Sequence, residues 1–258
     1  MQPAWESFAG PGLACVRVAG LATFAPMLAG GALPVRMRLA VAAAIAVAAM
    51  PAAGAAGVPA AALGEPWRLL PAAVLEFALG AALGVVALLP VAAFRSAGAL
   101  AGVQMGLGFG GVYDAEAGDA EGDAASRLLA AAGVALFAWC GGLDAVALAA
   151  MRTFDHAPAG AWSAAGAVPA ATGAALAACE LAFRVALPVT ALLVAEALVG
   201  GFVARSVPGM SPIAFGFPVR VIVGLAGLLA GAVAMQSSMQ GAVAGLLDRM
   251  RLAAGGAA

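Results

Sequence analysis

The sequence predicts an all-α, polytopic membrane protein, and three observations carry this prediction. Of the 258 residues, 64% are hydrophobic and only 10% are charged. The mean hydropathy of +1.04 is far above that of soluble globular domains. The apolar residues also gather in long stretches, each near the ~20 residues that a helix needs to cross a hydrocarbon core of roughly 30 Å. Unpaired backbone groups are costly in lipid, so these stretches are expected to be helices.

Six apolar regions follow one another along the chain. They are residues 8–29, 39–62, 69–93, 127–151, 172–203 and 212–247. Glu6 stands where a signal peptide would carry basic residues, so we expect the N-terminal segment to be retained as part of the structure. The last two regions are long and are separated only by the turn at 205–212, which predicts a helical hairpin from 172 to 247.

Prolines inside the apolar regions predict bent helices, because proline removes a backbone donor and disfavours helix at the preceding residue. They are Pro71, Pro90, Pro188, Pro212 and Pro218. Bent helices buried in protein are more typical of channels and transporters than of simple membrane anchors.

Nearly every apolar region contains ionisable residues. They are Arg17, Glu76, Arg95, Asp144, Glu180, Arg184, Glu196 and Arg220. A charge at the bilayer centre costs about 2.5–3.5 kcal/mol on insertion scales, so we expect these side chains to be buried against protein or to face a watery lumen. Glu180 and Arg184 are four residues apart on a helix and can neutralise each other. Charges satisfied inside a bundle and charges that line a lumen, including a proton relay, both remain open.

Glycines at a spacing of four predict close approach of helix backbones. Three pairs have this spacing: Gly80 with Gly84, Gly227 with Gly231, and Gly241 with Gly245. A longer stripe consists of Gly98, Gly102, Gly106 and Gly110. The stripe leads into a run without basic residues, whose acids are Asp114, Glu116, Asp119, Glu121 and Asp123. Glycine, apolar and acidic residues therefore meet in one segment between two apolar regions.

The composition argues against several classes of function. All twelve basic residues are arginine and the net charge is −1, so no nucleic-acid partner is predicted. His156 is the one histidine, the three cysteines are isolated, and no phosphate-binding or dinucleotide motif occurs. Asp114 and Asp144 only weakly match the paired aspartates of intramembrane proteases. We therefore expect no enzyme activity, no metal and no cofactor.

Three stretches in this order resemble the FliR family of flagellar type III export-gate proteins and its injectisome counterparts SctT, YscT and SpaR. The first runs from Arg17 through Pro26 to 33–40, the second is Gln-Met-Gly-Leu-Gly-Phe at 104–109, and the third runs from Pro188 to the Gly-Phe-Pro-Val-Arg sequence at 216–220. The resemblance covers essentially the whole chain.

The resemblance implies a single domain of the FliR type over residues 1–258, with a FliP-like part at about 1–168 and a FliQ-like hairpin at about 169–258. It implies a hetero-oligomer with FliP-like and FliQ-like subunits that forms a helical pore in the bacterial inner membrane, at the flagellar basal body and raised toward the periplasm. FlhA, FlhB, the rod-base protein FliE and unfolded export substrates are further implied partners.

The resemblance also implies that one loop plugs the channel until substrate passes. Its residues are Gln104, Met105, Gly106, Leu107, Gly108, Phe109 and Gly110. The expected function is export of flagellar rod, hook and filament proteins. The alternatives are an injectisome subunit of the SctT type and an ion-coupled secondary transporter, for which Glu180, Glu196 and Asp144 would be the coupling carboxylates.

Overall fold

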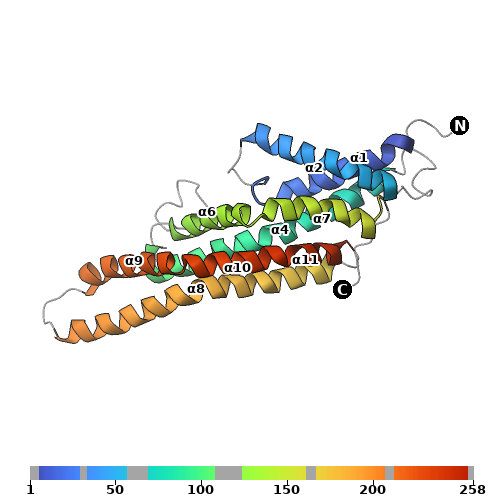
Figure 1. Cartoon of the computed structure of the whole chain (residues 1–258). Coiled ribbons are helices and arrows are strands. Elements are labelled where there is room, and N and C mark those ends of the chain that lie inside the picture. Colours follow the sequence, from blue (N-terminus) through green and yellow to red (C-terminus); the bar gives the residue numbers. More distant parts are fainter. Residues whose placement is uncertain are drawn as a thin grey trace. The chain divides into compact units, whose positions relative to one another are not determined.

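The computed structural model describes residues 6–29, 34–56, 69–107, 124–160, 167–206 and 212–254. The described residues form α-helices and no β-strand, so the predicted all-α class is confirmed (Figure 1). The helices are α1 (Glu6–Phe24), α2 (Val35–Ala56), α4 (Leu69–Met105), α6 (Ala124–Trp139), α7 (Gly142–His156), α8 (Ala167–Ser206), α9 (Pro212–Ala230), α10 (Ala232–Ala244) and α11 (Leu246–Ala253). Each of the six predicted apolar regions contains helix within its described residues.

Three of the described helices are long and apolar enough to cross a membrane, namely those at Val35–Ala53, Leu69–Met105 and Val168–Ser206. The number rises to five if each of two helix pairs, α6 with α7 and α9 with α10–α11, is counted as one broken span. Helix α1 adds a shorter apolar helix. The protein is therefore a multi-pass membrane protein.

Helix α4 is longer than the apolar region that predicted it. It continues from 69 through 93 to Met105, over 37 residues. Arg95 and Ser96 lower the hydropathy but do not interrupt the helix, and the Ser96 hydroxyl donates to the Ala92 carbonyl of its own helix. Gln104 and Met105, which we expected in a loop, consequently lie in the last turn of α4.

The helices are not interrupted at the prolines that predicted bends. Pro90, Pro188 and Pro218 lie inside continuous helices. Pro212 begins α9, where a missing backbone donor costs nothing. The described breaks fall at glycine instead: Gly141 has a φ of 75°, and Gly231 separates α9 from α10.

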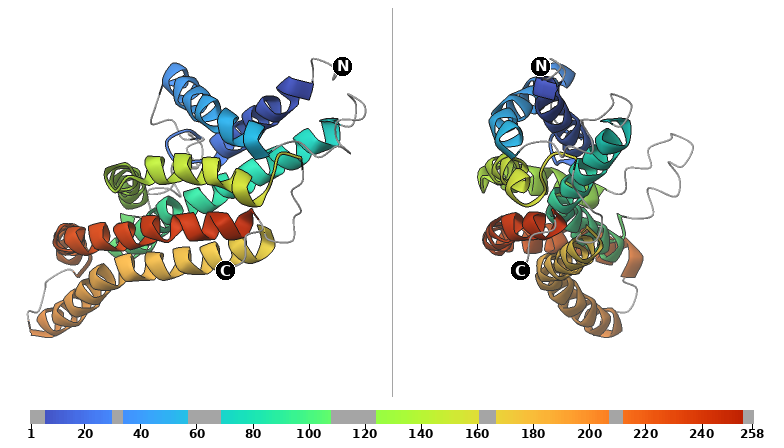
Figure 2. Two further views of the ribbon diagram at one scale, coloured as in Figure 1. Left: turned by 45° about the vertical axis from the view of Figure 1, so that its right-hand side comes forward. Right: turned by 90° about the vertical axis from the view of Figure 1, so that its right-hand side faces the viewer.

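The chain divides into two compact units. Unit 1 contains residues 1–89, 141–177 and 243–258, and unit 2 contains residues 90–140 and 178–242. In unit 1, α1 packs on α2 (Figure 2), and α7 contacts both α2 and α11. Its buried side chains include Leu21, Leu79, Leu83, Phe154 and Met250.

Helices α1 and α4 approach closely in unit 1 because glycines face the opposite backbone. A β-carbon at Gly80 would collide with the carbonyl oxygen of Arg17, and one at Gly84 would lie 2.6 Å from the carbonyl oxygen of Leu21. A β-carbon at Gly20 would collide with the carbonyl oxygen of Phe77. The close approach predicted from Gly80 and Gly84 is confirmed.

Glycines also allow two helices to pack closely at two places in unit 2. A β-carbon at Gly98 of α4 would lie 2.7 Å from the carbonyl oxygen of Ala125, which holds α6 against α4. Helices α8 and α9 run side by side (Figure 1), and a β-carbon at Gly227 of α9 would lie 2.9 Å from Leu192 Cδ1 of α8. These two arms are those of the hairpin predicted from the sequence.

Candidate functional site

A buried ion pair lies in unit 1, between α1 and α4. Arg17 Nε donates to Glu76 Oε2 at 2.6 Å, and Arg17 Nη2 donates to Glu76 Oε1 at 3.0 Å. The two side chains are 1% and 0% exposed. Two parallel hydrogen bonds between a guanidinium and a carboxylate form the strongest geometry available to such a pair.

Neighbouring groups satisfy the rest of this pair. Arg17 Nη1 donates to Thr153 Oγ1 at 3.0 Å, and Nη2 also donates to the carbonyl oxygen of Ala157 at 2.8 Å. The backbone N–H of Gly160 donates to Glu76 Oε1 at 2.8 Å. The guanidinium carbon lies 3.8 Å from the centre of the Phe154 ring, at cation–π distance. We call Arg17, Glu76 and these partners the buried network.

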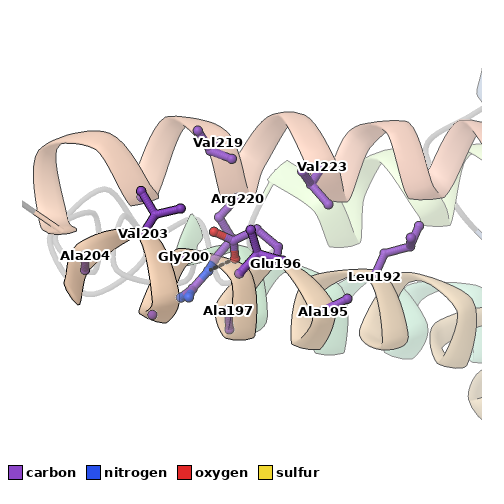
Figure 3. Close-up of a pocket in the computed structure, with 13 residues that line it drawn as sticks. Leu192, Ala195, Glu196, Ala197, Gly200, Val203, Ala204, Val219, Arg220 and Val223 are labelled. Carbon is purple, nitrogen blue, oxygen red and sulfur yellow. Dashed lines mark hydrogen bonds and ion pairs between the residues drawn. The ribbon is translucent and has the colours of Figure 1, made fainter. Parts of the chain in front are cut away.

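A second ion pair, in unit 2, joins the two arms of the hairpin. Arg220 Nε of α9 donates to Glu196 Oε2 of α8 at 3.1 Å. Arg220 is 41% exposed and Glu196 is 10% exposed. In Figure 3 the two side chains lie between the helices and point toward one another.

This second pair borders a groove of about 640 Å³ between α8 and α9. Apart from the pair, the lining is aliphatic and small, including Leu192, Val203 and Val223 (Figure 3). Gly200, Gly201 and Gly216 also line it. The groove exists because glycine and alanine side chains leave the space between the two arms unfilled.

The end of α4, which begins the predicted plug, is held by both arms of the hairpin. Gln104 Nε2 donates to Thr190 Oγ1 of α8 at 3.2 Å. Met105 is 0% exposed, and its side chain lies where a β-carbon at Gly224 of α9 would be. Gly106 follows with a φ of 81°, and its N–H donates to the carbonyl oxygen of Val103 at 3.1 Å, as in the usual glycine end of a helix.

Most of the remaining predicted site residues are either exposed or lie outside the described residues. Glu180 and Arg184 form the expected (i, i+4) pair at 2.6 Å, but they are 63% and 66% exposed. Arg95 and Asp144 are also exposed. That these four face another protein or a watery lumen stays a prediction. Gly108, Phe109, Gly110 and the acids from Asp114 to Asp123 lie outside the described residues.

Comparison with protein families decides the class. Residues 9–246 match the family described as bacterial export proteins, family 1, which contains FliR and its injectisome counterparts. The chain belongs to this family. No curated protein matches the chain closely enough to be reported. The bacterial export proteins of family 1 are components of the type III secretion export apparatus, a hetero-oligomeric export gate rather than a known class of enzyme.

Several residues of this export protein could not be singled out from its sequence. Thr153, Ala157 and Gly160 complete the buried network through backbone or hydroxyl groups that no pattern marks. Thr190 and Gly224 hold the end of α4 from separate helices. Their only sequence signals are weak, namely a hydroxyl inside an apolar helix and a glycine three residues before Gly227.

Proposed function

We propose that the chain is the FliR-type subunit of the flagellar type III export gate. It assembles with FliP-like and FliQ-like subunits into a channel in the bacterial inner membrane, at the flagellar basal body. Unfolded rod, hook and filament proteins pass through this channel. FlhA, FlhB and the rod-base protein FliE are its further partners. Family membership over 9–246 supports the export role, and the Gln-Met-Gly-Leu-Gly-Phe sequence at 104–109 favours the flagellar branch.

In this proposal residues 104–110 close the channel between substrates. Met105, Leu107 and Phe109 supply apolar bulk that excludes ions and water, and the glycines between them allow the segment to fold aside. The observation that carries this role is the attachment of the last turn of α4 to α8 and α9. A plug needs a defined starting point, and Gln104 and Met105 provide one.

Co-purification tests the assembly. The tagged chain, extracted in mild detergent, should bring down small FliP-like and FliQ-like subunits in a fixed ratio. A stable monomer that transports a solute in liposomes would contradict the proposal and favour an ion-coupled transporter. In that case replacement of Glu180, Glu196 or Asp144 by the matching amide should abolish transport.

Deletion of Gly106–Gly110 tests the closure. Cells that make the assembled gate with this deletion should leak ions, because the apolar barrier is gone. A matched control is the deletion of five residues outside the motif, from Glu116 to Ala120. Equal ion permeability in the two strains and in the wild type would show that residues 106–110 do not close the channel.

Loss of the gene separates the flagellar branch from the injectisome branch. We expect loss of flagella and of swimming, with both restored by a plasmid copy. If swimming persists and secretion of virulence proteins is lost, the chain is the SctT-type subunit instead.

A further inference from the structure

Helix α7 ends without the left-handed residue that closes many helices. Ala157 follows its last helical residue with a φ of −129° and a ψ of 85°. Pro158 comes next, and proline disfavours the helical conformation at the residue before it. Gly106, by contrast, closes α4 with a φ of 81°. Because a helix end leaves carbonyl groups without partners in the helix, the end of α7 needs partners from elsewhere.

Side chains of α1 and α4 supply these partners. Arg17 Nη2 donates to the carbonyl oxygen of Ala157 at 2.8 Å, and Arg17 Nη1 donates to the Thr153 hydroxyl in the last turn of α7 at 3.0 Å. Glu76 Oε1 accepts the backbone N–H of Gly160, in the turn that follows, at 2.8 Å. The positive charge of Arg17 also lies at the end of the helix where the helix dipole favours a cation. Arg17 and Glu76 therefore bind α7 and its turn at three points.

Water cannot replace these partners. Thr153 and Ala157 are buried, and so are Phe154 and Ala159 beside them. The Phe154 ring also packs against the Arg17 guanidinium, whose carbon lies 3.8 Å from the centre of the ring. A buried backbone or hydroxyl group that loses its partner is costly, whereas an exposed one would be hydrated. The contacts therefore hold the end of α7 in one position.

We propose that Arg17 and Glu76 are positioning residues that cap α7 from two other helices. The end of α7 takes its position only when α1 and α4 lie beside it, because the cap comes from their side chains. Helix α7 also contacts α2 and α11, so the cap fixes one end of the helix on which both pack. The cap lies within one chain, and it is independent of the proposed closure by residues 104–110 and of the branch of export gate.

Hydrogen–deuterium exchange of the purified gate tests this cap. The double variant Arg17→Met with Glu76→Leu removes both charges and leaves no unpaired charge behind. The amides of Ala157 and Gly160 should exchange about tenfold faster than in the wild type, because the turn loses its hydrogen bonds to both side chains. The amides of 145–149, in the first half of α7, should exchange at the wild-type rate. Unchanged exchange at Ala157 and Gly160, or an equal increase along the whole of α7, would overturn the inference.

Arg17→Lys separates the cap from the charge. Lysine keeps a positive charge beside Glu76, but its single ammonium lacks the forked guanidinium that reaches Glu76, Thr153 and Ala157 together. Exchange at Ala157 should therefore rise, by a smaller factor than in the double variant. Wild-type exchange in Arg17→Lys would show that the charge alone is sufficient, and it would contradict the cap.

Thr153→Val tests the cap with both charges in place, and it decides the question even if the Arg17 variants do not assemble. Valine keeps the size of the side chain and removes the oxygen that accepts from Arg17. Exchange should rise at Ala157 and stay unchanged at 145–149. Thr172→Val on α8 is the matched control, since the Thr172 hydroxyl donates to carbonyl oxygens of its own helix. If Thr153→Val and Thr172→Val show the same exchange at Ala157, the end of α7 does not depend on Arg17.

Discussion

The two units of the protein handle charge inside apolar helices in different ways. In unit 1, Arg17 and Glu76 are fully buried, and every nitrogen and oxygen of the pair has a partner. In unit 2, Arg220 donates a hydrogen bond to Glu196 beside a groove, and Arg220 is 41% exposed. The buried pair of unit 1 is costly to separate, because separation would leave an unpaired charge in an apolar interior. The pair of unit 2 can separate at small cost, because water reaches it.

The surrounding backbone follows the same division. In unit 1, Gly20, Gly80 and Gly84 bring α1 and α4 into backbone contact around the buried network. In unit 2, Gly200, Gly201 and Gly216 face the groove, and β-carbons at Gly201 and Gly216 would meet no atom of the chain within 4 Å. Glycine therefore tightens one region and leaves space in the other. Comparable sequence patterns serve a rigid unit and one with room to move.

Removal of one partner of the buried network should have the largest effect on stability. Glu76→Leu leaves the Arg17 guanidinium buried and unpaired, which costs on the order of 3–5 kcal/mol. We expect a strongly reduced amount of chain in purified gates and a lower thermal midpoint. The double change Arg17→Met with Glu76→Leu should be better tolerated than Glu76→Leu alone. If Glu76→Leu alone were as stable as the wild type, the two units would not differ in the cost of breaking their ion pairs.

Widening the contact between α1 and α4 should have the next largest effect. The methyl group of Gly80→Ala would overlap the backbone of Arg17, and overpacking of this kind costs about 1–3 kcal/mol. Gly12→Ala on the exposed side of α1 is the control, because a β-carbon there meets nothing within 4 Å. Thermal unfolding of gates that contain each variant provides the comparison. If gates containing Gly80→Ala and gates containing Gly12→Ala have the same thermal midpoint, α1 and α4 are not in close contact.

The half-buried pair should matter less to stability. Glu196→Gln keeps an oxygen that can accept from Arg220 and removes only the charge. Because Arg220 is well exposed, the change should cost at most about 1 kcal/mol. In the same thermal-unfolding assay, the midpoint should fall much less for Glu196→Gln than for Glu76→Leu. A shift as large as the one for Glu76→Leu would mean that the groove is closed in the assembled gate.

The exposed pair on α8 should have the smallest effect on the chain itself. Glu180→Gln removes an (i, i+4) pair worth about 0.3–0.5 kcal/mol. Its thermal midpoint should match that of the wild type. Reduced co-purification of the other gate subunits with an unchanged midpoint would place this face of α8 at an interface, as the prediction of charges facing protein requires.

The sequence predicted much of the fold, because long apolar stretches leave the backbone no alternative to helix. It missed the extension of α4 to Met105, since Arg95 and Ser96 lower the hydropathy without breaking the helix. It predicted bends at Pro90, Pro188 and Pro218, and the helices continue through all three positions without a break. Hydropathy reports the environment of a segment, whereas helix boundaries depend on local backbone bonding.

The candidate site was predicted less completely. The ionisable residues were found by their cost in an apolar setting, but the pairing of Arg17 with Glu76 joins residues 59 positions apart. The pairing of Glu196 with Arg220 joins separate arms of the hairpin. Neither spacing is a helical repeat, so only the packed structure reveals which charges meet. The role of Gly224 follows from a side chain on another helix, and no local pattern contains that information.

We propose that residues 104–110 close the export channel between substrates. The most direct measurement is the ion permeability of cells that carry the assembled gate, compared between the wild type and the Gly106–Gly110 deletion with no substrate in the channel. We predict a tight membrane for the wild type and a large, continuous leak for the deletion. Equal permeability, with both gates present in equal amounts, would contradict the account.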